Sequence, residues 1–162
     1  FRAPKVDHFS RRLAFDVLPH IDKFTEDGFT LEEHKMINET RKILARPELA
    51  VCATCVRVPV FVGHALSVNV ELENTFELSE IAEALDQQEG IVFQNEQSDF
   101  PTSADATGQD PVYVGRLRRD PSVPNGIVMW VVADNLRKGA ATNAVQIAET
   151  IFHQGRWAEM SK

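Results

Sequence analysis

Three features that are common in other classes of protein are missing from this sequence of 162 residues. No apolar run approaches the roughly 18–20 residues that a transmembrane helix needs. Its eight glycines are scattered, so that neither a G-x-G-x-x-G fingerprint nor a P-loop is present. These absences exclude a membrane span and a nucleotide-binding glycine-rich loop within the sequence as given. Because the first residue is Phe1 and not Met, we expect the chain to be a piece of a longer protein.

Basic residues are also fewer than acidic residues. The chain has 17 Lys and Arg residues against 24 Asp and Glu residues, which gives a formal net charge of −7. Nucleic acid binding needs a basic face, so nucleic acid is not expected as a partner. The composition, 43% hydrophobic and 25% charged, is that of an ordinary globular protein with a buried core. We therefore expect a soluble, globular protein.

Cysteine is scarce as well, with Cys52 and Cys55 forming a single C-x-x-C. The pair sits in a β-branched apolar stretch, where residues three apart on a strand point to opposite sides, so a disulfide is disfavoured. A zinc site would need two further ligands at suitable spacing, and the sequence offers none. We expect two buried, reduced cysteines and no metal.

The hydrophobic pattern predicts an α+β fold with a mixed, mainly antiparallel sheet covered by helices. A capping box formed by Thr30 and Glu33 predicts a helix that runs to about Ala45. Ser79 is expected to cap a second helix that ends near Gln88, and residues 94–110 read as a long loop. The closing helix, about Leu136 to His153, carries an apolar stripe, and we expect it to be helical only where another surface covers that stripe. Strands are predicted at 12–18, 49–61, 65–73, 91–93, 111–119 and 126–133.

Arg57 and His64 are the two residues that interrupt the apolar run of residues 54–71. Pro59 and Gly63 lie between them and predict a turn. A planar guanidinium holds a carboxylate with two hydrogen bonds, and an imidazole that titrates near neutrality can move a proton. The pair therefore suits a small anionic substrate. A structural salt bridge for Arg57 and a turn-capping His64 would give the same pattern, and the residues alone leave both interpretations open.

Two further pairs of residues are candidate ligand-binding positions. Glu32 and Lys35 are three apart on a predicted helix and share a face, either as a solvated ion pair or as contacts to a substrate ammonium and a phosphate. Asp134 and Asn135 follow the most apolar strand, either as an ordinary strand-to-helix turn or as a ligand-binding helix start. Three arginines on one predicted strand give a weaker indication of an anion or interface contact: Arg116, Arg118 and Arg119.

Several motifs along the whole chain resemble one enzyme family. They are Glu-Glu-His-Lys-Met at 32–36, Cys-Val-Arg-Val-Pro-Val at 55–60, Gly63-His64, Val-Gly-Arg-Leu-Arg at 114–118 and Asp-Asn-Leu-Arg-Lys-Gly-Ala-Ala at 134–141. In this order they are similar to the C-terminal half of the bacterial aspartate-semialdehyde dehydrogenases. The fold that this resemblance implies is the C-terminal domain of the glyceraldehyde-3-phosphate-dehydrogenase-like type.

The resemblance also implies roles for single residues. Arg57 is similar to the residue that binds the substrate carboxylate, and His64 to the acid/base catalyst. Glu32 matches the contact to the substrate amino group, Lys35 the phosphate-site lysine, and Asn135 a position that contacts NADP. These enzymes reduce β-aspartyl phosphate with NADPH to aspartate semialdehyde and phosphate, on the route to lysine, diaminopimelate, methionine and threonine.

The resemblance also implies how the roles are divided between this chain and the rest of the protein. The nucleophilic cysteine and most of the NADP site belong to the family's first half, so this fragment alone should be inactive. Residues 1–133 would form the substrate-binding and dimerisation domain of a homodimer, and residues 134–162 would pack on the nucleotide-binding domain. Two alternatives stay open: a related N-acetyl-glutamyl-phosphate reductase, and a stand-alone, non-catalytic binding or assembly module.

Overall fold

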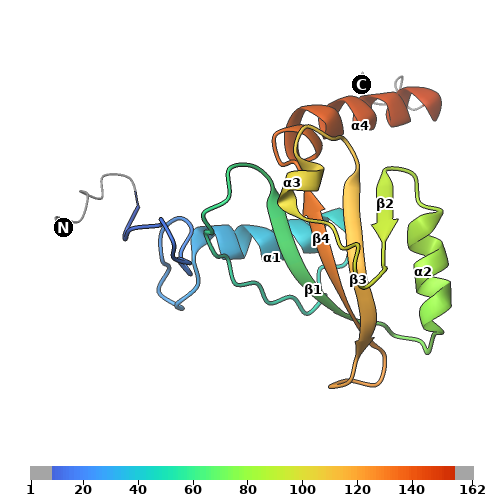
Figure 1. The fold of residues 1–162 in the computed structure, drawn as a ribbon, viewed down its shortest axis with the longest axis horizontal. Coiled ribbons are helices and arrows are strands. Elements are labelled where there is room, and N and C mark those ends of the chain that lie inside the picture. Colours follow the sequence, from blue (N-terminus) through green and yellow to red (C-terminus); the bar gives the residue numbers. More distant parts are fainter. Residues whose placement is uncertain (1–8, 156–162) are drawn as a thin grey trace. The chain divides into compact units, whose positions relative to one another are not determined.

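The computed structural model describes residues 9–155 and divides the chain into two compact units, Phe1–Pro59 and Val60–Lys162. Figure 1 shows the first unit with a single long helix and the second with the sheet and the remaining helices.

The helix of the first unit, α1, spans Leu31–Ile43 and confirms the capping-box prediction. The Thr30 hydroxyl accepts a hydrogen bond from the Glu33 N–H at 3.3 Å, and the Glu33 carboxylate accepts one from the Thr30 N–H at 2.8 Å. The helix ends before Ala45, whose φ of 51° lies in the left-handed region. Pro47 follows and prevents the helix from resuming.

The strands predicted at 12–18 and 49–61 are wrong. Residue Phe15 has a φ of 64°, which breaks the first extended run. Residues 51–58 are extended, with alternating half-buried and exposed side chains, but only Arg57 forms a β-bridge there, with Leu18. An extended segment becomes a strand only when its backbone is paired along its length. The apolar pattern indicated the conformation and could not indicate whether a partner strand was present.

The second unit contains a four-stranded sheet in the order β1-β4-β3-β2, and this confirms the mixed, mainly antiparallel sheet. The pairs β1–β4 and β3–β4 are antiparallel, and β2–β3 is parallel. A β-bulge between Gly115 and Arg118 interrupts the β3–β4 register. The strands are β1 (His64–Glu71), β2 (Ile91–Gln94), β3 (Val112–Asp120) and β4 (Gly126–Ala133).

Two helices flank this sheet. Helix α2 (Leu78–Asp86) lies beside β2 and contacts β2 and β3 (Figure 1). Its N-cap is Glu77 and not Ser79, since the helix begins at Leu78 and the Glu77 N–H donates to the Glu80 carboxylate at 2.8 Å. The short helix α3 (Ser103–Ala106) interrupts the predicted loop 94–110 and contacts β4.

The closing segment consists of a π-helical turn, Arg137–Ala141, and helix α4, Thr142–His153. Helix α4 extends beyond the end of the sheet (Figure 1). The predicted apolar stripe is largely open, because Ala140, Ala144, Ile147 and Ala148 are exposed and Ile151 is half-buried. The structure describes a single chain, so the expectation that another surface covers this stripe stays a prediction.

The buried core of the second unit is formed by the two central strands of the sheet and the short helix α3. Val132 on β4 and Ala106 on α3 are both fully buried. The other buried apolar residues come from the two central strands: Val114, Leu117, Ile127 and Val128. Within residues 9–155, none of the helices combines the length and the apolar character that crossing a bilayer requires.

Candidate active site

The first turn of α1 carries the predicted pair Glu32 and Lys35. The Lys35 ammonium lies 3.5 Å from a Glu32 carboxylate oxygen, and the two side chains are 55% and 30% exposed. They do share a helix face, as their spacing predicts. An exposed pair of this kind contributes little to stability, so both charged groups remain available to a ligand.

Arg57 is half-buried and its backbone is fixed by two hydrogen bonds. Its N–H donates to the Leu18 carbonyl at 2.8 Å, and its carbonyl accepts from the Leu18 N–H at 2.9 Å. The guanidinium lies 4.8 Å from the centre of the Phe9 ring, a cation–π contact that orients its plane. No carboxylate of residues 9–155 forms an ion pair with Arg57. The alternative of a structural salt bridge therefore finds no partner in the part of the chain that the structure describes.

Glu33 has a second partner that its role as a helix cap did not predict. One carboxylate oxygen accepts from the Thr30 N–H, and the other accepts from the Cys55 N–H, also at 2.8 Å. The bond from Cys55, followed by those from Thr30, holds the pKa of Glu33 below its ordinary value. The carboxylate thus connects the start of α1 to the segment that carries Arg57. No local sequence signal marks this contact, because the two residues are 22 positions apart.

Both cysteines are free, and they differ in exposure. Cys55 is half-buried, and burial together with the charges of Glu33 and Glu32 raises the pKa of its thiol. A thiol with a raised pKa is a poor nucleophile. The expectation that both cysteines are buried is wrong for Cys52, which is exposed, because it falls on the open side of the extended segment. Across the described residues, no group of three or more His, Cys, Asp and Glu side chains is arranged to hold a metal ion.

In the second unit, His64 opens β1 and is exposed. Gly63 before it has a φ of 90°, and a Cβ at that position would lie 3.3 Å from the Ala133 carbonyl oxygen. Glycine therefore suits both the backbone conformation and the close approach. His64 pairs with Ala133 on β4, and Asn135 is two residues further along the chain. The sheet register thus brings the two predicted site residues of this unit to the same end of the sheet.

Asp134 fixes the turn that carries Asn135. Asp134 is buried, with 4% of its surface exposed. Its two carboxylate oxygens accept hydrogen bonds from the N–H groups of Gly108 and Leu136, both at 2.9 Å. The bond from Gly108, ahead of that from Leu136, holds the pKa of Asp134 below its ordinary value. Asn135 is consequently held, half-buried, at the start of the π-helical turn. The sequence pattern pointed to Asn135 and left Asp134 without a specific role.

A second carboxylate anchors the far side of this turn. Arg137 donates to both oxygens of Asp110, at 2.9 and 3.0 Å, and the Thr142 hydroxyl donates to Asp110 at 2.7 Å. This bidentate pair lowers the pKa of Asp110. The turn after β4 is therefore tied to the segment that follows α3 at two points.

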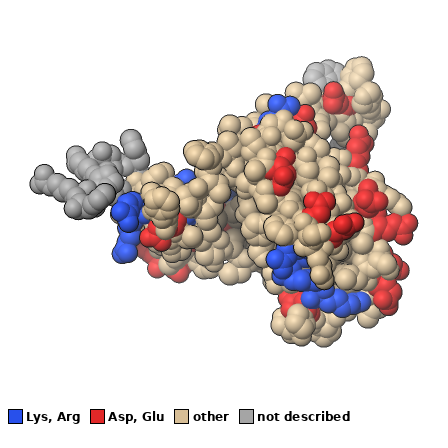
Figure 2. Space-filling view, in the orientation of Figure 1, with Lys and Arg blue, Asp and Glu red and all other residues tan. Residues whose placement is uncertain are grey.

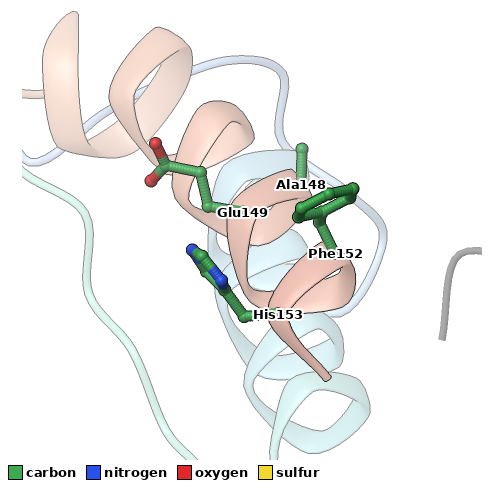
Figure 3. A pocket seen from close by; sticks show the side chains of 4 residues that line it. All are labelled: Ala148, Glu149, Phe152 and His153. Carbon is green, nitrogen blue, oxygen red and sulfur yellow. The ribbon is translucent and has the colours of Figure 1, made fainter. Parts of the chain in front are cut away.

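The surface of the second unit has two further features. An open hollow of about 420 Å³ is lined only by residues of α4, namely Ala148, Glu149, Phe152 and His153 (Figure 3). Figure 2 shows acidic side chains over much of the second unit and basic side chains gathered near the lower end of β3. Arg119 stacks on Phe76 at 4.3 Å, and Arg118 donates to the Arg116 carbonyl at 2.9 Å. Two of the three arginines of β3 thus have partners within the chain.

Comparison with known families adds a direct finding. A model described as "Semialdehyde dehydrogenase, dimerisation domain" matches residues 1–138. The chain belongs to this family.

Individual members of the family agree with this assignment. Aspartate-semialdehyde dehydrogenase of Aquifex aeolicus is 51% identical over 154 residues, which are 94% of this chain and 45% of that protein. Aspartate-semialdehyde dehydrogenase 2 of Vibrio cholerae is 52% identical over 145 residues, which are 88% of this chain and 42% of that protein. The chain thus spans less than half the length of these relatives.

Solved structures in the family share the fold. Aspartate semialdehyde dehydrogenase II of Vibrio cholerae superposes with a TM-score of 0.87 at 49% identity, covering 92% of this chain and 44% of the other, and a complex of the same enzyme with ASA gives the same values. The enzyme of Candida albicans with NADP superposes with a TM-score of 0.68 at 25% identity, covering 86% of this chain and 45% of the other. The predicted α+β class and the resemblance to aspartate-semialdehyde dehydrogenases are confirmed.

Proposed function

We propose that this chain is the substrate-binding and dimerisation part of an NADP-dependent enzyme that interconverts β-aspartyl phosphate and aspartate semialdehyde. The observation that carries the proposal is the similarity to a solved aspartate semialdehyde dehydrogenase complexed with ASA, at 49% identity over 92% of the chain. Such an enzyme serves the biosynthesis of lysine, diaminopimelate, methionine and threonine in the cytoplasm.

In the proposed enzyme the first unit recognises the substrate. Arg57 binds the substrate carboxylate through two hydrogen bonds, and its contact with Phe9 sets the plane of the guanidinium. Glu32 binds the substrate ammonium and Lys35 binds phosphate. The 3.5 Å separation of these two charges supports a site where a cation and an anion of the ligands lie side by side. Fixing both ends of the substrate removes orientational freedom before reaction.

The second unit supplies proton transfer and a cofactor contact. His64 acts as the acid/base catalyst, because the tetrahedral species of acyl transfer must gain and lose protons. Its exposed position at the start of β1 leaves the imidazole accessible to a ligand. Neither Cys52 nor Cys55 fits the nucleophile, since Cys55 has a raised pKa and neither matches the family's nucleophile motif. The nucleophilic cysteine therefore belongs to the other half of the intact protein.

The residues after β4 fit a contribution to NADP binding. Asn135 presents a half-buried amide, which can donate to and accept from a carboxamide, and the turn that carries it is fixed by Asp134. When bound, NADPH supplies the hydride. Most of the cofactor site lies in the absent domain, on which residues 134–162 pack. The exposed apolar stripe of α4 supports this packing, because exposed apolar area is unfavourable in water.

The intact protein is proposed to be a homodimer that forms through this half. The family description, a dimerisation domain, supports this assembly. Symmetric dimers that use one surface patch twice are the commonest assemblies of soluble proteins.

An activity measurement tests the proposed function. The intact protein that contains this chain should reduce NADP in the presence of aspartate semialdehyde and phosphate, and omission of phosphate should abolish the reaction. The 162-residue chain should show no activity, because binding a substrate without the reacting groups is not catalysis. Failure of the intact protein to turn over aspartate semialdehyde, with N-acetyl-glutamate semialdehyde accepted in its place, would favour the related reductase. Turnover by the 162-residue chain alone would contradict the division of roles.

A further inference from the structure

A single buried carboxylate connects the two substrate-binding elements of the first unit. Glu33 is 7% exposed and Thr30 is 1% exposed. The Glu33 carboxylate accepts one N–H from Thr30, at the start of α1, and one from Cys55, in the extended segment. We call these two hydrogen bonds the Glu33 bridge. Both oxygens are engaged with backbone, so the carboxylate is part of the frame and is not free to bind a ligand.

The elements that the Glu33 bridge joins carry the proposed substrate contacts. Glu32 is the neighbour of Glu33 on α1, and Lys35 pairs with Glu32. Arg57 is two residues beyond Cys55 on the same side of the extended segment, and its backbone is fixed to Leu18. The segment from 55 to 57 is thus held at both ends, at Cys55 by Glu33 and at Arg57 by Leu18.

We infer that Glu33 is a positioning residue that sets the spacing between Glu32 on α1 and Arg57 on the extended segment, and so the length of substrate that the two can hold together. This inference rests on the proposed function. A substrate with a carboxylate and an ammonium at fixed separation needs both partners within a few tenths of an ångström of their places. Among residues 9–155 the extended segment has no strand partner apart from the Leu18 bridge, so sheet pairing there does not supply that precision.

The carboxylate is the group that this arrangement needs. Two N–H donors converge on residue 33, and a carboxylate offers an acceptor oxygen to each. An amide offers one oxygen and one NH₂, and the NH₂ would face an N–H donor. Glu33→Gln therefore removes one of the two bonds while it keeps the size of the side chain. Glu33→Asp keeps the charge but shortens the side chain by one methylene, so it cannot reach both donors.

The kinetic test compares two variants of the intact enzyme with the unaltered enzyme. Glu33→Gln should raise KM for aspartate semialdehyde about 10- to 100-fold, since misplacement by about 1 Å is worth up to about 100-fold, and KM for NADP should stay within about twofold. The matched control is Thr30→Ala, which removes the hydroxyl cap but leaves both bonds of the Glu33 bridge. It should lower the melting temperature and leave both KM values within about twofold. Unchanged KM for aspartate semialdehyde in Glu33→Gln, or an equal rise in Thr30→Ala, would overturn the inference.

If Glu33→Gln does not fold, Glu33→Asp takes its place with the same expected rise in KM, and an unchanged KM in that variant would likewise overturn the inference.

A second experiment does not depend on enzyme activity and uses the 162-residue chain. In the unaltered chain, Cys52 is exposed and Cys55 is half-buried beside Glu33, so iodoacetamide should alkylate Cys52 faster. Glu33→Asp keeps the negative charge that raises the pKa of the Cys55 thiol but breaks the bridge, so it should accelerate alkylation of Cys55 severalfold and leave Cys52 unchanged.

The two readouts separate the inference from the proposed function. Absence of turnover by the unaltered intact enzyme would overturn the proposed function and with it the substrate spacing. Equal alkylation rates of Cys55 in the unaltered chain and in Glu33→Asp would instead show that Glu33 does not hold the segment, whatever the enzyme's substrate is.

Discussion

Replacing Arg57 by Lys in the intact enzyme should be far from conservative. The planar guanidinium of Arg57 is oriented by the Phe9 ring, whose centre is 4.8 Å away. The backbone N–H and carbonyl of Arg57 are both hydrogen-bonded to Leu18. Lysine keeps the charge but offers a single ammonium on a flexible stem. It can make one strong hydrogen bond to a substrate carboxylate where arginine makes two.

The magnitude follows from the contacts that are lost. One hydrogen bond between charged groups contributes about 1.5–3 kcal/mol, and a partly exposed cation–π contact contributes about 0.5–1 kcal/mol. Together they amount to about 2–4 kcal/mol, which corresponds to a fall in kcat/KM of about 30- to 1,000-fold. Most of the loss should be in KM for aspartate semialdehyde, because the carboxylate is held before and during reaction.

The assay is phosphate-dependent reduction of NADP at varied aspartate semialdehyde. Arg41→Lys serves as the matched control, since Arg41 is on the same unit, donates to the Leu49 carbonyl at 2.8 Å and has no proposed ligand. It should keep kcat and KM within about twofold. Phe9→Leu should give a small loss, about two- to fivefold, from the cation–π contact alone. Values of kcat/KM within about threefold of the unaltered enzyme for Arg57→Lys would refute the carboxylate-binding role.

Further predictions concern the other unit and the assembly. His64→Ala should lower kcat by about 10²- to 10⁴-fold with little change in KM; near-normal kcat would exclude the acid/base role. Because the pKa of Asp134 is lowered in the folded chain, its stabilising effect should be complete above about pH 4 and be lost as the pH falls through the folded pKa. The melting temperature of Asp134→Asn should therefore depend less on pH below about pH 5, and parallel curves would contradict this. Val132→Ala should lower the free energy of unfolding by about 2–3 kcal/mol in urea titrations, whereas the exposed Val56→Ala should change it by less than about 0.5 kcal/mol. Light scattering of the chain should give the mass of a dimer, and a monomer at all concentrations would count against self-association.

Much of the fold could be predicted because its signals are local. The capping box of Thr30 and Glu33 marks the start of α1, and the alternation from Leu66 to Glu71 marks β1. The two predicted strands of the first unit failed because pairing is not local. Their apolar residues indicate an extended chain, but whether a backbone finds a partner strand depends on segments far away in the sequence. The exposure of Cys52 was missed for the same reason.

The sequence by itself determined which residue types are present for the proposed chemistry and in which order along the chain. It placed Glu32 and Lys35 on one helix face, because helical spacing is fixed by the backbone geometry. Only the tertiary structure decided that the second oxygen of Glu33 binds the Cys55 N–H and that β1 pairs with β4 so that His64 lies opposite Ala133. Both contacts join segments at least 22 positions apart, and the order of residues along the chain does not specify which distant segments meet.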